Sequence, residues 1–136
     1  MNVLVDTSVW SLALRRNPPS RAPEVAELVE LIREQRVEII GPIRQEVLSG
    51  VRSRAQFRLL RDRLRAFPDL LLSHEDYEQA AEFFTTCRGR GVQGSNTDFL
   101  ICAAAHRRGL AVFTTDNDFQ MFQHHIPVRL HTPRPT

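Results

Sequence analysis

Apolar runs and helical stripes alternate along the chain. Residues 2–6 and 110–114 are short runs, rich in apolar residues, of the kind that form buried strands. Between them, apolar residues recur at helical spacing in residues 23–35, with acidic residues at intervening positions. Strands that alternate with helices predict a parallel sheet, because parallel neighbours need crossover connections and helices usually supply them.

The same pattern sets approximate limits for each element. The expected strands are residues 2–6, 37–40, 70–72, 110–114 and 128–130. The expected helices are residues 8–15, 23–35, 42–50, 52–65, 73–88, 96–108 and 118–123. Ser73 and Asp76 resemble a capping box at one helix start, and Gly109 ends another helix. We therefore predict a three-layer α/β/α domain with a central, mainly parallel sheet of four or five strands.

Length and composition favour one domain. A chain of 136 residues with 42% hydrophobic content can bury one core. We assign residues 1–132 to this domain and expect residues 133–136 to form a loose tail. Without an apolar run near the roughly eighteen residues of a membrane span, and without a signal peptide, we expect a cytoplasmic protein and no membrane segment. Cys87 and Cys102 lack C-x-x-C spacing, so we expect reduced core thiols.

The basic residues are all Arg, since the chain contains no Lys. This absence argues against receiver-type phosphorelay domains, P-loop nucleotide hydrolases and haloacid-dehalogenase-like phosphatases, which use a Lys. Six of the Arg residues lie between Arg52 and Arg65, a density suited to phosphates, carboxylates or an acidic partner. The expected helix there has an apolar stripe beside a basic one, formed by Arg54, Arg58, Arg61 and Arg65. A solvated helix face is the alternative explanation.

Four acidic residues lie at the ends of the expected elements. Asp6 ends the first strand, and Asp116 follows the strand at 110–114. Asp98 opens one helix and Glu46 lies about a turn into another. Each has an ordinary structural explanation: Asp6 or Thr7 can cap the following helix, Asp98 can be a first-turn acid favoured by the helix dipole, Asp116 can hold a turn and Glu46 can face water.

Taken together, the four acids predict more than their separate structural roles. The carboxyl ends of parallel strands meet at one edge of a sheet, where function concentrates. Carboxylates gathered in one cleft repel each other unless a cation offsets their charge. Oxygen ligands without His or Cys favour Mg²⁺ or Mn²⁺ over zinc. A carboxylate-bound Mg²⁺ activates water and neutralises a phosphoryl group, which predicts phosphodiester hydrolysis.

Four stretches of the sequence resemble the successive acidic motifs of PIN-domain nucleases. They are V-D-T-S-V-W at 5–10, Q-E-V-L-S-G at 45–50, N-T-D-F-L-I-C-A-A-A at 96–105 and T-T-D-N-D-F at 114–119. Their order and the chain length resemble the VapC toxins of bacterial toxin–antitoxin pairs. The resemblance implies a Mg²⁺-dependent endoribonuclease that cuts tRNA, rRNA or mRNA and is inhibited by a cognate VapB-type antitoxin. A homodimer is expected as well.

The resemblance also implies a role for each matched acid. Asp6 and Asp98 are the expected direct metal ligands, and Asp116 is expected to bind directly or through water. Glu46 is expected to hold a metal-bound water or a second ion.

Three further residues lie beside the matched acids. Asp118 resembles an additional acid that many members of the family carry. Thr7 and Thr114 are expected to hydrogen-bond the acids or the scissile phosphate. The antitoxins of such toxins typically insert an Arg near the acids, which suits a carboxylate cluster.

Other functions fit the sequence less well. A receiver-like domain has a similar size and acids at strand ends, but it needs the missing Lys. A non-catalytic PIN-like binding module would be expected to have lost some of the acids, and all four are present. The five His residues are scattered, and His124 and His125 would point in different directions. For Trp10 we expect packing in the core or a dimer interface.

Overall fold

A short parallel sheet forms the centre of the molecule. The computed structural model describes residues 1–15 and 18–135. Strand β1 (Val3–Val5) lies between β2 (Val37–Glu38) and β3 (Ala111–Phe113), in the order β2-β1-β3. Val3 is opposite Val37 on one side and Ala111 on the other, and both pairings are parallel. All three residues of β1 are buried, which explains why this strand has no polar position before Asp6.

The sheet has fewer strands than the sequence predicts. Four or five strands were expected, but the described residues form three, flanked by two isolated bridges. The segment expected at 70–72 contributes only the bridge from Asp69 to Ile39, and the segment at 128–130 only that from Leu130 to Val112. Pro68 and Pro127 precede these bridges, and a proline cannot donate to a strand ladder. Both segments therefore touch the sheet edge without extending along it.

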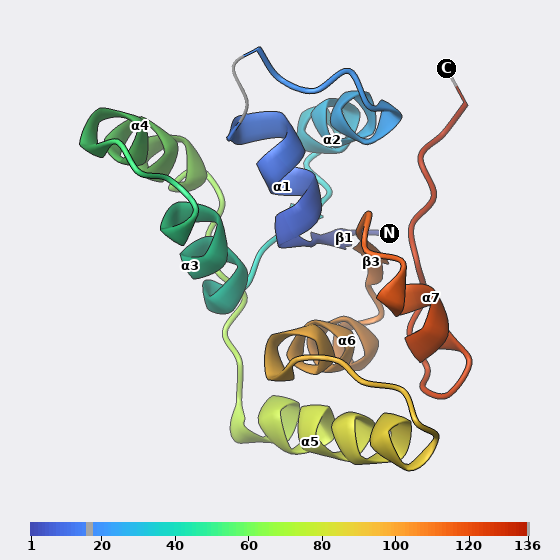
Figure 1. The fold of residues 1–136 in the computed structure, drawn as a ribbon. Helices are drawn as coiled ribbons and strands as arrows, with labels where there is room; N and C mark the ends of the chain where they lie inside the picture. Colours follow the sequence, from blue (N-terminus) through green and yellow to red (C-terminus); the bar gives the residue numbers. More distant parts are fainter. Residues whose placement is uncertain (16–17, 136) are drawn as a thin grey trace.

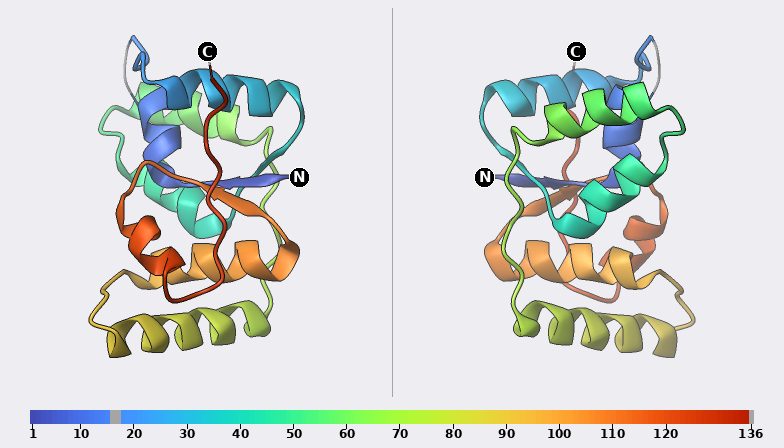
Figure 2. Two further views of the ribbon diagram at one scale, coloured as in Figure 1. Left: turned by 90° about the vertical axis from the view of Figure 1, so that its right-hand side faces the viewer. Right: turned by 90° about the vertical axis from the view of Figure 1, so that its left-hand side faces the viewer.

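Helices cover both faces of the sheet, as predicted, and give three layers (Figures 1 and 2). They are α1 (Thr7–Leu14), α2 (Pro23–Arg33), α3 (Gly41–Ser49), α4 (Arg54–Leu64), α5 (His74–Gly89), α6 (Asn96–Arg108) and α7 (Asp118–Gln123). The views place α1, α2 and α4 on one side, and α6 with the outer α5 on the other. No helix in residues 1–15 and 18–135 has both the length and the apolar character of a membrane span.

The core is built around α1 and α6. Every residue of α6 from Phe99 to Ala105 is buried, because this helix lies between the sheet and α5. Trp10 of α1 is 1% exposed and packs edge-on against Phe67, with ring centroids 5.2 Å apart. The core position expected for Trp10 is therefore confirmed. Cys87 and Cys102 are buried free thiols, and burial raises the pKa of each.

The end of the chain is held against α2. Residues 133–136 were expected to be loose, and Thr136 lies outside the described residues. Arg134 donates from Nε to Glu27 Oε1 at 2.7 Å and from Nη2 to Glu34 Oε1 at 2.9 Å. Figure 2 shows the segment crossing the sheet before it reaches α2. Ion pairing with two glutamates thus places residues 133–135 on the domain.

A buried carboxylate joins α5 to α6. Asp76 is fully buried and completes the expected capping box, accepting from Ser73 N at 2.8 Å. Arg107 Nε and Arg108 Nη1 donate to Asp76 Oδ1 at 2.9 and 2.8 Å, and Arg108 Nη2 donates to Oδ2 at 2.8 Å. The hydrogen bonds from Arg108 hold the pKa of Asp76 far below its usual value. The ionised carboxylate therefore stabilises the pairing of these two helices.

We expect Asp76→Asn to lower the free energy of unfolding by about 2–4 kcal/mol, since it leaves two guanidinium groups without their buried anion. The partial exposure of both guanidinium groups keeps the loss at this level. Because the folded-state pKa is lowered, the contribution is present above the unfolded pKa and is lost as the solution becomes strongly acidic. Urea unfolding at pH 7 measures the effect.

Asp62→Asn is the matched control, because its pair with Arg61 lies at the surface. Its free energy of unfolding is expected to stay within about 0.5 kcal/mol of wild type. Equal stabilities for the two variants would contradict a structural role for Asp76.

Candidate active site

Asp6 connects the sheet to the candidate site. Its backbone N–H donates to Phe113 O at 2.8 Å and so continues the pairing of β1 with β3. Its backbone carbonyl accepts from Val9 and Trp10 and starts α1. Asp6 occupies the N-cap position of that helix, as one structural explanation proposed, but its carboxylate makes no side-chain capping hydrogen bond there. It accepts from Ser8 Oγ at 2.9 Å and from Thr114 Oγ1 at 2.8 Å, in a position only 6% exposed.

The loop after β3 is ordered around Asp116. Thr114 Oγ1 accepts from Asp116 N at 3.0 Å, and Asp116 Oδ1 accepts from Asp118 N at 2.9 Å. Thr115 N donates to Ser8 Oγ at 3.0 Å, which ties the loop to the start of α1. Asp116 thus holds the turn, as its structural explanation proposed, while it lies half-buried beside Asp6. Asp118 is exposed in the first turn of α7.

Asp98 brings a third carboxylate to the same place. It forms a capping box at the start of α6, accepting from Ser95 N at 3.0 Å and donating its own N–H to Ser95 Oγ at 3.0 Å. Burial raises the pKa of Asp98, and the negative charges of Asp6 and Asp116 raise it further. Burial also raises the pKa of Asp6, although hydrogen bonds from Thr114 and Ser8 oppose this effect. Asp6 and Asp116 are therefore close enough to Asp98 for their charges to act on it.

Glu46 approaches this group from α3. Thr7, the residue after Asp6, donates from Oγ1 to Glu46 Oε1 at 2.7 Å. Glu46 is exposed and faces solvent, as its structural explanation proposed. The hydrogen bond from Thr7 also holds its carboxylate near the end of β1. The four acids thus come from two strand ends and two helices: Asp6 follows β1, Asp116 follows β3, Glu46 lies within α3 and Asp98 lies in the first turn of α6.

A protein-family model matches most of the chain. The model for the PIN domain matches residues 3–124. The chain belongs to the PIN domain family. PIN domains are typically nucleases, which places this chain among the hydrolases that act on nucleic acids. No curated protein matches the chain by sequence search.

Several solved structures have the same PIN fold. The crystal structure of FitAcB from Neisseria gonorrhoeae has a TM-score of 0.77 and 25% identity, with 96% of this chain and 97% of that chain covered. VapBC2 from Rickettsia felis, bound to a promoter DNA fragment, has a TM-score of 0.73 and 16% identity, with 96% and 98% covered. VapBC-1 from nontypeable Haemophilus influenzae has a TM-score of 0.72 and 15% identity, with 96% and 97% covered. The similarity to the two VapBC structures shows a shared fold.

The acids of this PIN domain suit a hard cation only in part. Within residues 1–15 and 18–135, no group of three or more His, Cys, Asp or Glu side chains is placed to hold a metal ion. The set of Asp6, Asp98 and Asp116 therefore stays a prediction as a three-residue ligand set. Mg²⁺ commonly uses one or two carboxylates and fills its other positions with water and substrate phosphate. Burial raises the pKa of both Asp6 and Asp98, and like charge adds to the shift at Asp98, so a bound cation would favour the ionised form of both groups.

Ser8 is a site residue that the sequence analysis did not identify. Its hydroxyl donates to Asp6 and accepts from Thr115 N, so it joins α1 to the loop that carries Asp116. The signal for it was a hydroxyl two residues after the first acid. That signal is weak, because the partner in the loop is more than a hundred positions away.

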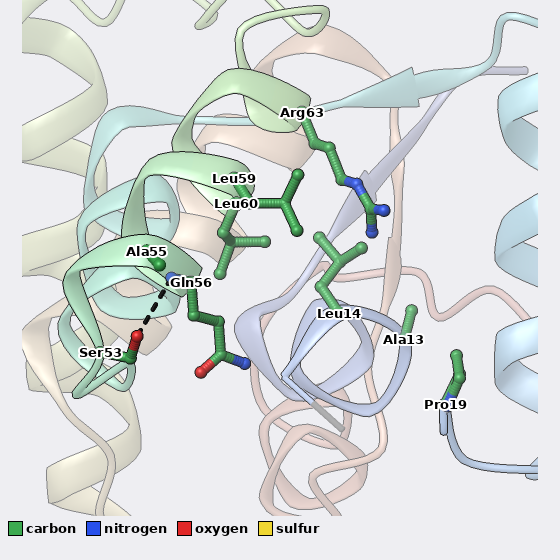
Figure 3. Close-up of a pocket in the computed structure, with 9 residues that line it drawn as sticks. All are labelled: Ala13, Leu14, Pro19, Ser53, Ala55, Gln56, Leu59, Leu60 and Arg63. Atoms are coloured by element: carbon green, nitrogen blue, oxygen red, sulfur yellow. Dashed lines mark hydrogen bonds between the residues drawn. The ribbon is translucent and has the colours of Figure 1, made fainter. Parts of the chain in front are cut away.

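The Arg-rich helix borders a different cavity of the PIN domain. A cavity of about 670 Å³ separates α1 from α4 and is lined in part by Leu14, Leu59, Leu60 and Arg63 (Figure 3). The four Arg residues that the sequence predicted for contact do not line it. Arg54, Arg58 and Arg65 are exposed, and Arg61 pairs with Asp62 at 3.1 Å. The basic face of α4 is thus available at the surface.

We expect Asp98→Asn to make the apo protein more stable at pH 7, because it removes one of the mutually repelling charges. A carboxyl group whose pKa is raised in the folded state destabilises the fold above that pKa. The penalty disappears as the pH falls below the unfolded value, 3.8. The gain in urea midpoint should therefore be present at pH 7 in EDTA and absent near pH 3.5.

Glu78→Gln, on the exposed face of α5, controls for the loss of one negative charge. A gain for Glu78→Gln as large as that for Asp98→Asn would contradict repulsion within the site.

Proposed function

We propose that this PIN domain is the toxin of a toxin–antitoxin pair and acts as a Mg²⁺-dependent endoribonuclease, with Mn²⁺ as a substitute. The observation that supports this most is the approach of Asp6 and Asp116 to Asp98. Three separate segments bring these carboxylates together, and the charges of the other two raise the pKa of Asp98. A fold that gathers repelling charges at the carboxyl end of its sheet is suited to binding a divalent cation.

Each residue has a separate task in the proposed reaction. Asp6 and Asp98 would hold the ion, and Asp116 would bind it directly or through water. A divalent ion bound there lowers the pKa of a water molecule and offsets charge on the phosphoryl group. Glu46, oriented by Thr7, would accept a hydrogen bond from the attacking water. Ser8 and Thr114 keep the Asp6 carboxylate in one orientation.

The proposed substrate is RNA, whether tRNA, rRNA or mRNA. The exposed guanidinium groups of Arg54, Arg58 and Arg65, with that of Arg61, would guide its phosphate backbone towards the acids. Arg suits this task because its planar fork donates two hydrogen bonds to a phosphate.

The proposed partner is a cognate antitoxin of the VapB type. The similar structures include FitAB and VapBC-5 from Mycobacterium tuberculosis, and the latter belongs to the VapBC family of toxin–antitoxin systems. The cavity between α1 and α4 offers an apolar segment a place to bind, and Leu59 beside it is 54% exposed. Inhibition of cleavage by the product of a short neighbouring reading frame would test this partner. The homodimer remains a prediction.

Two alternatives compete less well. The family assignment excludes a receiver domain. A PIN-like binding module without catalysis has no need to keep all four acids, which this chain retains.

We expect wild-type protein to cleave a mixed RNA pool in Mg²⁺ and to stop in EDTA. Asp6→Ala or Asp98→Ala should reduce the cleavage rate by about 100-fold or more, since each removes a proposed ion ligand. Gel analysis of end-labelled RNA measures the rate, and far-UV circular dichroism checks the fold.

Glu78→Ala serves as the control, because it removes an exposed carboxylate from α5 and should cleave at the wild-type rate. Full activity of both site variants would overturn the assigned site, and cleavage in EDTA would overturn the metal requirement.

We expect Arg58→Gln with Arg61→Gln to flatten the salt dependence of RNA binding. Each lost phosphate contact should reduce the slope of log affinity against log salt by about 0.7 for single-stranded RNA, or about 1.4 for both. Fluorescence anisotropy between 50 and 200 mM salt measures the slope. An unchanged slope would assign the basic face of α4 to the antitoxin or to solvent.

A further inference from the structure

A second cavity lies beside Glu46, along α3. Its volume is about 530 Å³, and its walls include Arg15, Gln45, Glu46, Ser49, Gly50 and Thr97. Glu46 belongs to the candidate site, and Thr97 precedes Asp98 in the first turn of α6. We call this cavity the Arg15 cleft. It shares Glu46 with the candidate site.

Arg15 is held rigidly in this cleft. Its Nε donates to Val47 O at 3.1 Å and its Nη2 to Glu46 O at 2.6 Å. These carbonyls belong to the last turn of α3, where backbone acceptors lack helical partners and the helix dipole is negative. The guanidinium group also lies against Gly50, where a Cβ atom would come within 2.1 Å of Arg15 Cζ. Only glycine at position 50 leaves room for this side-chain conformation.

The charge of Arg15 is not cancelled by a carboxylate. In the part of the chain that the structure describes, its hydrogen bonds go to neutral carbonyls, and it takes part in no ion pair. Arg44, also on α3, contrasts with it: Arg44 pairs with Asp69 at 3.0 Å and donates to the carbonyl of Leu64. Arg44 therefore has a structural partner, while Arg15 presents a fixed positive charge to the cleft.

We propose that the Arg15 cleft binds the RNA backbone next to the scissile phosphate, with the Arg15 guanidinium paired to a flanking phosphate. A guanidinium held in place loses little freedom on binding an anion, and its fork matches a phosphate. Gln45, Ser49 and Thr97 supply neutral hydrogen-bonding groups around it. This cleft deepens the proposed function and rests on it, because it assigns where the strand beyond the cut lies.

The test compares the salt dependence of RNA binding in an Asp98→Asn background, which keeps the RNA intact. A labelled single-stranded RNA is titrated in fluorescence anisotropy between 50 and 200 mM salt. Arg15→Gln should reduce the slope of log affinity against log salt by about 0.7, so that the affinity ratio between the two salt concentrations falls about 2.5-fold. Arg15→Lys keeps the charge and should keep the slope.

A purely structural role for Arg15 gives a different result. Loss of its hydrogen bonds to α3 would weaken binding equally at every salt concentration, and Arg15→Lys would behave like Arg15→Gln. Arg33→Gln is the matched control, since Arg33 ends α2 and pairs with Glu30 at 2.7 Å. This control should keep the wild-type slope.

Gln45→Glu tests the cleft without touching Arg15. Gln45 is exposed on α3 and lines the cleft, so the fold should tolerate the change. A negative charge there should weaken RNA binding and lower the slope, and Gln45→Arg should do the opposite. Unchanged slopes for Arg15→Gln and both Gln45 variants would overturn the proposal.

The outcomes separate this proposal from the proposed function. If wild-type protein cleaves RNA in Mg²⁺ while the slopes stay unchanged, only the Arg15 cleft is overturned. If the slopes change as expected but neither Mg²⁺ nor Mn²⁺ supports cleavage, the nuclease function is overturned and the cleft stands as an RNA-binding site. If the background protein binds no RNA and wild-type protein cleaves none in Mg²⁺ or Mn²⁺, both are overturned.

Discussion

The fold and the site depend on one residue, Asp6, whose backbone and side chain do different work. Its backbone N–H extends the ladder between β1 and β3, so its position is fixed by the sheet. Its carboxylate remains almost fully buried, where a charge is unfavourable unless hydrogen bonds or a cation compensate. Two hydroxyl groups supply part of that compensation. A bound cation would supply the rest of the compensation for this buried charge. This requirement connects the position of Asp6 in the sheet to the chemistry expected of a PIN domain.

The second half of the site is positioned by α3, which is anchored to both ends of α1. Near the start of α1, Thr7 donates to the side chain of Glu46. Just after its end, Arg15 donates to the backbone of Glu46 and Val47. The carboxylate of Glu46 is therefore exposed but not free to move away from Asp6. An exposed acid that is fixed by two contacts can serve a substrate that arrives from solvent.

The elements far from the acids supply rigidity. The packing of α5 on α6 buries Asp76 between two guanidinium groups, and α6 carries Asp98 at its opposite end. The final segment crosses the sheet and pairs with Glu27 and Glu34, so it covers the edge formed by β3. These contacts hold in place the segments that carry the acids. Without them, repulsion between like charges would push these segments apart.

The sequence by itself determined the helices, because their signals are local. Helical spacing, the Ser73–Asp76 cap and Gly109 at a helix end involve residues within a few positions, and the structure has helices close to the predicted limits. The four motifs likewise predicted the family, since each is a contiguous run. Only the tertiary structure decided the rest: the two single bridges at the sheet edges, the anchoring of Arg134, the hydrogen bonds of the Asp6 carboxylate to Ser8 and Thr114, and the contacts of Arg15. Each of these depends on a partner that the fold brings from a distant part of the chain, and no local pattern specifies which distant group will arrive.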